Sequence, residues 1–175
     1  KIRLGRYLLN SLFTDPKLYV VESHFTFEPD LLNLQDPCYV DGYWHSEKYF
    51  LDIEDIIRAE FTLREPFGHY SASVSKKIAD AENPVALHIR RNDRVTNPKT
   101  RKLRGITSPK FYATAQKIIR AHVGNPTYFV FSDDIEWAQN NVHTGFPTEF
   151  IGQGEDKGCE DMILMSQCKH HIIAN

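Results

Sequence analysis

The chain has 175 residues, of which 41% are hydrophobic and 25% charged, values typical of a globular protein with an apolar core. Its 21 basic and 23 acidic side chains leave a formal net charge of −2, which gives no support to general nucleic-acid or membrane-surface binding. No apolar run approaches the roughly 20 residues of a membrane helix. The cysteines, Cys38, Cys159 and Cys168, fit neither a disulfide framework nor a zinc site. We therefore expect a cytoplasmic protein, or one peripheral to the inner membrane face.

The first 82 residues predict short elements separated by breaks. Apolar spacings favour helices over residues 2–13, 46–61 and 71–81, and strands over residues 18–27 and 38–40. In the second helix, Ser46 is the predicted N-cap, and apolar side chains from Tyr49 to Phe61 share one face.

From residue 83 the pattern becomes a regular alternation of strands and helices. Short apolar runs predict buried strands over residues 85–89, 127–131, 148–151 and 171–174. Ser108 and Pro109 predict the start of the first intervening helix, on which Phe111, Ala115, Ile118 and Ile119 should be buried. Further helices are expected after residue 134 and from 159 to 168. This order predicts an α/β fold with a doubly wound, Rossmann-like parallel sheet, whose strand ends meet at one edge.

The strand over residues 85–89 ends in charge. If its alternation continued, His88 and Arg90 would share one face, while Arg91 and Asp93 would share the other and could pair. Arg90 would then project from the ligand-binding edge of the sheet. The sequence contains neither common phosphate loop, so a guanidinium fork would have to bind any phosphate here. The alternative is that both arginines are solvated charges at a strand end.

A basic segment follows this strand. Between residues 94 and 110 there is no acidic side chain, and the sequence predicts a loop. Its cations are Arg94, Lys99, Arg101, Lys102, Arg104 and Lys110. The segment is either a mobile solvated loop or a cover for a bound anion. Nucleic-acid binding is disfavoured, because interleaved aromatic residues and overall basicity are both missing.

Four motifs lie in order along the chain. They are Gly-Tyr-Trp-His-Ser-Glu-Lys-Tyr-Phe at 42–50, His-Ile-Arg-Arg-Asn-Asp at 88–93, Ser-Asp-Asp-Ile-Glu-Trp at 132–137, and the Asp-Met to Ile-Ile-Ala-Asn segment at 161–175. Together they resemble the bacterial α-1,2-fucosyltransferases of glycosyltransferase family 11, over about residues 42–175. The second motif alone is shared with α-1,6- and protein O-fucosyltransferases.

The resemblance implies a GT-B enzyme of which this chain is a part. Residues 1–82 would be a remnant of the acceptor-side lobe with connecting helices. Residues 83–175 would be the GDP-fucose-binding lobe, truncated at its C-terminus. Family members begin with a Gly-Gly-Leu-Gly-Asn-Gln-type turn and continue past Ile-Ile-Ala-Asn, and neither segment occurs here.

The resemblance also implies roles for individual residues. Arg90 would contact the β-phosphate, with His88 and Arg91 beside the nucleotide. Asp161 would accept hydrogen bonds from guanine, unless it is only an acid favoured at a helix start. His88 could instead be a satisfied core histidine. The remaining donor-binding candidates line the adjacent strand end: Ser132, Asp133 and Asp134. Asp133 could simply cap the following helix.

The implied reaction is inverting transfer of L-fucose from GDP-fucose to the 2-hydroxyl of a terminal galactose in a glycan. Arg90 would stabilise the departing GDP, with no cofactor or metal. His170 and His171 lie near Cys168, but adjacent side chains on a strand diverge, so we expect no metal site there. Asp93 is the nearest candidate for the base that takes the acceptor proton. The alternatives are another fucosyltransferase, α-1,6 or protein O-linked, and a truncated, catalytically silent GDP-binding module.

Overall fold

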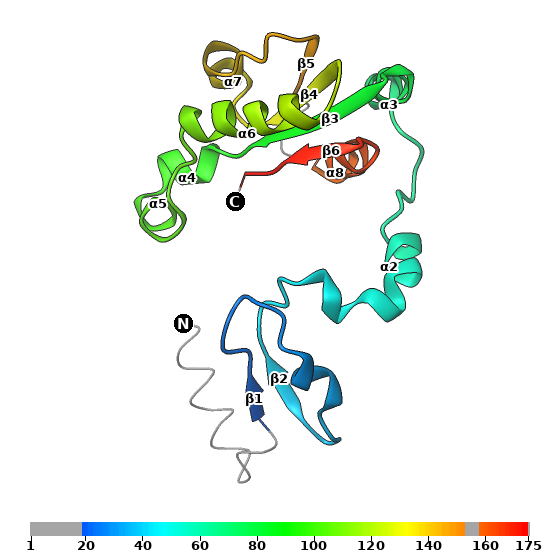
Figure 1. The fold of residues 1–175 in the computed structure, drawn as a ribbon, viewed down its shortest axis with the longest axis vertical. Coiled ribbons are helices and arrows are strands. Elements are labelled where there is room, and N and C mark those ends of the chain that lie inside the picture. The colour runs from blue at the N-terminus through cyan, green and yellow to red at the C-terminus, as the bar shows by residue number, and fades with distance from the viewer. Residues whose placement is uncertain (1–18, 153–157, 175) are drawn as a thin grey trace. The chain divides into compact units, whose positions relative to one another are not determined.

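The computed structural model describes residues 19–152 and 158–174, so the predicted helix over residues 2–13 lies outside the described residues. The chain divides into two compact units, Lys1–Phe61 and Thr62–Asn175, which are described separately (Figure 1). The boundary lies near residue 61 and not near residue 82, because the helix over residues 69–80 packs with the sheet of the second unit.

The first unit contains a small parallel pair of strands. In it, β1 (Tyr19–Val21) pairs with β2 (Tyr39–Asp41), with Tyr19 opposite Tyr39. The two tyrosine rings stack with centroids 5.3 Å apart, and the Tyr19 hydroxyl donates to Asp41 Oδ2 at 2.7 Å. The predicted strands are thus present, although the first is much shorter than residues 18–27.

The helix predicted over residues 46–61 is broken into three pieces. These are the 3₁₀ turns η3 (Glu47–Tyr49) and η4 (Leu51–Ile53) and the helix α2 (Glu54–Glu60); a further 3₁₀ turn, η2 (Pro29–Asn33), lies earlier. The Ser46 cap is confirmed, since its Oγ accepts the Lys48 N–H at 3.4 Å. The apolar face is not buried, however: Ile56 and Phe61 are 62% and 60% exposed. The spacing of apolar residues predicted a buried helical face, but none of the residues of η3, η4 or α2 is fully buried.

The second unit is built on a four-stranded parallel sheet, as predicted. Its strands are β3 (Asn83–Ile89), β4 (Pro126–Ser132), β5 (Thr148–Ile151) and β6 (His170–Ile172), in the order β5-β4-β3-β6. Leu87 is the register partner of both Val130 and Ile172. The chain steps outward from β3 to β5 and returns to the other side of β3, so the order reverses between β3 and β6.

Helices cover both faces of this sheet. They are α3 (His69–Asp80), α4 (Asn92–Thr96), α5 (Pro98–Arg104), α6 (Pro109–His122), α7 (Ile135–Asn141) and α8 (Gly158–Ser166), labelled in Figure 1. Side chains of α6 and α7 pack against Leu87 and Val130, whereas α3 and α8 pack against Ala86 and Phe129. These two sets lie on opposite faces because side chains alternate along a strand. Each large apolar side chain that is buried contributes about 1.5 to 3 kcal/mol to the free energy of unfolding. No helix among the described residues is long and apolar enough to cross a bilayer.

The α6 helix starts where the sequence predicts, and its buried face agrees with the prediction in part. Ser108 Oγ accepts the Phe111 N–H at 3.4 Å, which confirms the cap. The fully buried positions are Tyr112 and Gln116, while Phe111 and Ile118 are 43% and 59% exposed. Ala115 and Ile119 pack against the core as predicted, so the buried face overlaps the predicted one in part and is centred on Tyr112 and Gln116.

The predicted loop over residues 94–110 is wrong, because α4 and α5 occupy most of it. Asn97 caps α5 by accepting the N–H groups of Lys99 and Thr100 at 2.9 and 3.3 Å. Pro98 takes the first turn, and Gly105 ends the helix with φ of +67°. Asn97 followed by Pro98 is a typical start of a helix. The prediction of a loop gave more weight to the many positive charges of this segment.

Candidate functional site

The carboxyl ends of β3, β4 and β5 border a cavity of about 750 Å³. Most of the predicted site residues line it, and they are accompanied by apolar residues and glycines that the sequence analysis did not select. The lining residues are His88, Arg90, Asn92, Asp93, Phe131, Ser132, Asp133, Ile135, Gly152, Gly158, Asp161 and Met165. Arg91 and Asp134 are predicted donor-binding residues that lie outside this lining. The cavity therefore lies at the edge of the sheet at which the sequence predicted a ligand site.

Arg90 lies in the cavity wall beside the carboxylate of Asp93. Its Nε and Nη2 donate to Asp93 Oδ1 and Oδ2 at 3.2 and 3.4 Å, and the two side chains are 52% and 44% exposed. The predicted pairing of Arg91 with Asp93 is wrong, because β3 ends at Ile89 and helical backbone begins at Asn92. Strand alternation does not extend across that junction. The hydrogen bond from Arg90 lowers the pKa of Asp93, so in this state Asp93 is a weak proton acceptor.

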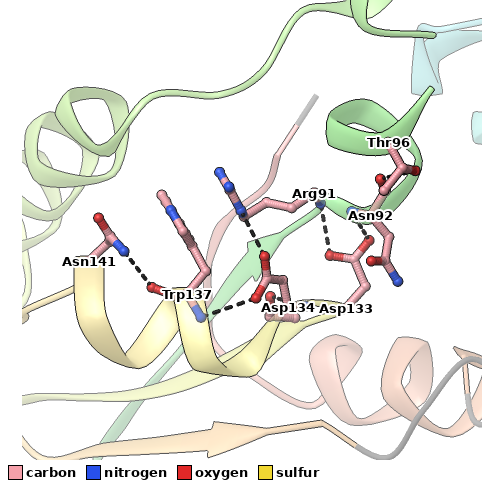
Figure 2. A network of polar contacts seen from close by, with 8 residues as sticks. Arg91, Asn92, Thr96, Asp133, Asp134, Trp137 and Asn141 are labelled. Atoms are coloured by element: carbon pink, nitrogen blue, oxygen red, sulfur yellow. Dashed lines mark hydrogen bonds and ion pairs between the residues drawn. The ribbon is translucent and has the colours of Figure 1, made fainter. Parts of the chain in front are cut away.

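Arg91 is not among the cavity-lining residues, and its side chain lies beside Asp134 and Trp137 (Figure 2). Its Nε donates to Asp134 Oδ2 at 3.1 Å, and its guanidinium lies 3.9 Å from the centroid of the Trp137 ring. Asp134 also caps α7, since Oδ1 accepts the Trp137 N–H at 3.1 Å. Both side chains are committed to structural contacts, which provide no support for their predicted direct role in donor binding.

Asp133 joins the ends of β3 and β4. Its two carboxylate oxygens accept the backbone N–H groups of Arg91 and Asn92 at 2.8 and 3.0 Å, as Figure 2 shows. The alternative that Asp133 caps the following helix is wrong, since Asp134 does so. By holding the turn that follows Arg90, Asp133 positions that arginine at the cavity.

His88 contributes a neutral ring to the cavity wall. Burial lowers its pKa, and the charges of Arg90 and Arg94 lower it further, while Asp133 acts in the opposite direction. A neutral imidazole has one hydrogen-bond donor and one acceptor. His88 is half-buried and lines the cavity, so it is placed to contact a ligand.

Arg94, on α4, is a feature that sequence reasoning missed. It is only 3% exposed, and its Nε is buried without a hydrogen-bond partner. A buried guanidinium with incomplete pairing is costly, and the charge of Arg94 contributes to the lowered pKa of His88. The sequence placed Arg94 among solvated cations, and no local signal indicated its burial.

The remaining lining residues give the cavity an apolar side. Phe131, Ile135 and Met165 come from β4, α7 and α8. Gly152 follows β5, and a Cβ at this position would overlap the Ile135 side chain, so only glycine fits there. In the sequence, the glycines between residues 152 and 158 were the feature that could have indicated this part of the cavity wall. Residues 153–157 lie outside the described residues.

The side chains near the C-terminal strand make other contacts. His171 Nε2 bonds the carbonyl oxygen of Met165 at 2.9 Å, and burial raises the pKa of the Cys168 thiol to about 12. Within residues 19–152 and 158–174, no three His, Cys, Asp or Glu side chains are grouped as a metal ion requires. Metal independence of the reaction stays a prediction.

Comparisons with known proteins agree with this arrangement of motifs. The model of the family described as "Glycosyl transferase family 11" matches residues 20–175. The chain belongs to this family. The resemblance predicted from the four motifs is thereby confirmed.

Relatives in family 11 come from bacteria and primates. An Alpha-1,2-colitosyltransferase of Escherichia coli is 34% identical over 142 residues, which cover 77% of this chain and 46% of the relative. The O-antigen biosynthesis glycosyltransferase WbnK of Escherichia coli is 38% identical over 104 residues, covering 57% of this chain and 33% of the relative. The Galactoside alpha-(1,2)-fucosyltransferase 1 of Alouatta belzebul is 26% identical over 159 residues, covering 86% and 43%. This chain thus spans less than half the length of each relative. No solved structure matches significantly.

Proposed function

We propose that this chain carries the donor-binding site of an inverting glycosyltransferase, which transfers L-fucose or its 3-deoxy analogue colitose from the GDP-sugar to the 2-hydroxyl of a terminal galactose. Family membership supports glycosyl transfer, and the names of the relatives support these two sugars and the α-1,2 linkage. In this proposal the second unit corresponds to the donor lobe of a GT-B enzyme, and the first unit belongs to the acceptor side.

The observation that carries the proposal is the cavity at the carboxyl edge of the parallel sheet, with Arg90 in its wall. Open α/β sheets bind ligands at this edge, and a cavity of about 750 Å³ lies in the range of sites for molecules of this size. The wall offers charge for a diphosphate and apolar surface for a base or sugar. Arginine matches phosphate geometry because its N–H donors form a planar fork.

In the proposed mechanism, an arriving diphosphate competes with Asp93 for Arg90. The Arg90–Asp93 pair is about half exposed, so it gives way readily to a doubly charged ligand. Arg90 then stabilises the charge that grows on GDP as the glycosidic bond breaks. Asp93 simultaneously loses the hydrogen bond that lowers its pKa, and becomes a better acceptor for the proton of the attacking hydroxyl.

Guanine recognition is assigned to Asp161, which lines the cavity in the first turn of α8. A carboxylate accepts hydrogen bonds from the N1–H and N2–H₂ edge of guanine, and no other nucleobase presents that pair of donors. His88 and Ser132 supply further polar contacts for the nucleotide from β3 and β4.

The test is a transfer assay on the full-length protein with GDP-fucose and GDP-colitose. Acceptors ending in galactose, in core chitobiose or in a folded peptide separate the α-1,2, α-1,6 and protein-directed reactions. We expect an α-1,2-linked product on galactose alone, identified by NMR, with one GDP released per product and no loss of rate in EDTA. Transfer to another acceptor, or GDP binding without transfer, would contradict the proposal.

A further inference from the structure

A second cavity, of about 510 Å³, shares part of its wall with the first. It is lined by Arg90, Asp93, Lys99, Thr100, Leu103 and Arg104. The Arg90–Asp93 pair borders both cavities, so a ligand in the second lies next to the groups that we assign to glycosyl transfer. No residue of α5 lines the donor cavity, and the function proposed above assigns no role to the surface of this helix.

The second cavity carries an excess of positive charge. Its cations are Arg90, Lys99 and Arg104, and its one carboxylate is Asp93. When a donor diphosphate binds Arg90, the two cations Lys99 and Arg104 still outnumber Asp93. Lys99 and Arg104 take part in no ion pair within the described part of the chain. The segment from 94 to 110 contains no acidic residue that could neutralise them.

The α5 helix presents these groups together. Positions 99, 100, 103 and 104 lie on one side of a helix, because neighbours on a helical face are three or four residues apart. The Asn97 cap holds the Lys99–Thr100 turn, with N–H···Oδ1 distances of 2.9 and 3.3 Å. Leu103 is 81% exposed, which adds an apolar contact beside the cations. Arg101 and Lys102 are also exposed but do not line the cavity.

We propose that this second cavity is a subsite for a negatively charged group on the acceptor glycan. This inference rests on the proposed function and adds the substrate class of the same site. Lys99 and Arg104 bind the anion, the Thr100 hydroxyl donates a hydrogen bond, and Leu103 contacts an apolar part of the acceptor. The anion is either the carboxylate of an acidic sugar or the diphosphate of a lipid-linked glycan.

The experiment uses the full-length protein and a matched acceptor set. One acceptor is a neutral galactoside, the second bears a uronic acid next to the galactose, and the third bears a diphosphate with a short alkyl chain at its reducing end. The test variant is Lys99→Glu/Arg104→Glu. The control, Arg101→Glu/Lys102→Glu, makes the same charge change on the same helix but outside the cavity.

We expect the wild type to prefer one anionic acceptor by kcat/KM, and which one identifies the source of the anion. The cavity variant should lower the ratio of anionic to neutral kcat/KM by about tenfold, because two weak ion pairs become repulsive. The control should change that ratio by less than about threefold. Equal use of all three acceptors by the wild type, or equal losses in both variants, would overturn this inference while leaving α-1,2 transfer in place. Absence of transfer to any acceptor would overturn the proposed function and this inference with it.

Discussion

Arg90 and Arg91 are adjacent in sequence, yet their surroundings differ in kind. Arg91 bonds Asp134, stacks on Trp137 and is largely covered, with 16% of its side chain exposed. Arg90 is 52% exposed in a cavity wall, and within the described residues it pairs with the carboxylate of Asp93, which a ligand can displace. One arginine therefore stabilises the turn, and the other is available for an anion.

The strongest test of the structural side is Arg91→Ala. The variant loses the ion pair with Asp134 and the stacking on Trp137, which are both partly buried. We expect a loss of about 2 to 3 kcal/mol in the free energy of unfolding, measured by urea denaturation. Unchanged stability would show that Arg91 is as dispensable to the fold as an exposed strand-end charge.

Asp133→Ala addresses the link between the two arginines. Removing the carboxylate leaves the N–H groups of Arg91 and Asn92 without their acceptor, although water can reach this exposed turn. We expect a loss of about 1 to 2 kcal/mol in unfolding free energy. GDP affinity should fall as well, because Arg90 is no longer positioned. Asp133→Asn retains one acceptor oxygen and should lie between the wild type and alanine, and a loss equal to that of alanine would contradict this reading.

Asp161→Asn tests the base-recognising side of the cavity. If the carboxylate binds guanine, affinity for GDP should fall about tenfold, while affinity for UDP stays the same. Glu160→Gln removes the same charge from the same turn of α8, at a position that does not line the cavity. Equal effects of the two variants on both nucleotides would show that Asp161 does not bind guanine and only interacts favourably with the dipole of α8.

The smallest expected effect is the pH dependence that His88 gives to stability. Because burial lowers its pKa in the folded state, the unfolded chain binds more protons at pH values below the ordinary value of 6.5. Stability should therefore fall as the pH decreases below about 6.5, and level off once the folded-state pKa is passed. Denaturation curves of His88→Gln, compared with the wild type, should lack this contribution, which is under about 1 kcal/mol. The same slope in both proteins would contradict it.

The sheet could be predicted because its signals are local. The apolar runs that became β3, β4, β5 and β6 are short and bounded by turn residues, and Ser108-Pro109 marked the start of α6. The carboxyl ends of these parallel strands, which place Arg90 and Ser132, then had to meet at one edge of the sheet. The location of the cavity follows from that order alone.

The side-chain contacts at the edge could not be predicted, because they depend on residues far apart in sequence. Asp133 accepts from a turn about 40 positions earlier, and the side chain of Arg91 reaches α7. The directions of the Arg90 and Arg91 side chains depend on where β3 ends. The prediction continued the strand alternation past Ile89 and therefore paired Asp93 with Arg91, whereas Asp93 pairs with Arg90. The burial of Arg94 likewise required knowing that α4 replaces the predicted loop.

In the proposed function, Arg90 binds the diphosphate of a sugar nucleotide. The most direct test of this contact is calorimetric titration of GDP into Arg90→Ala, with Arg101→Ala as an exposed arginine control outside both cavities. We predict that Arg90→Ala binds GDP about 10- to 100-fold more weakly than the wild type, with an unchanged melting temperature, while Arg101→Ala binds normally. Wild-type affinity for GDP in Arg90→Ala would show that Arg90 does not bind the diphosphate.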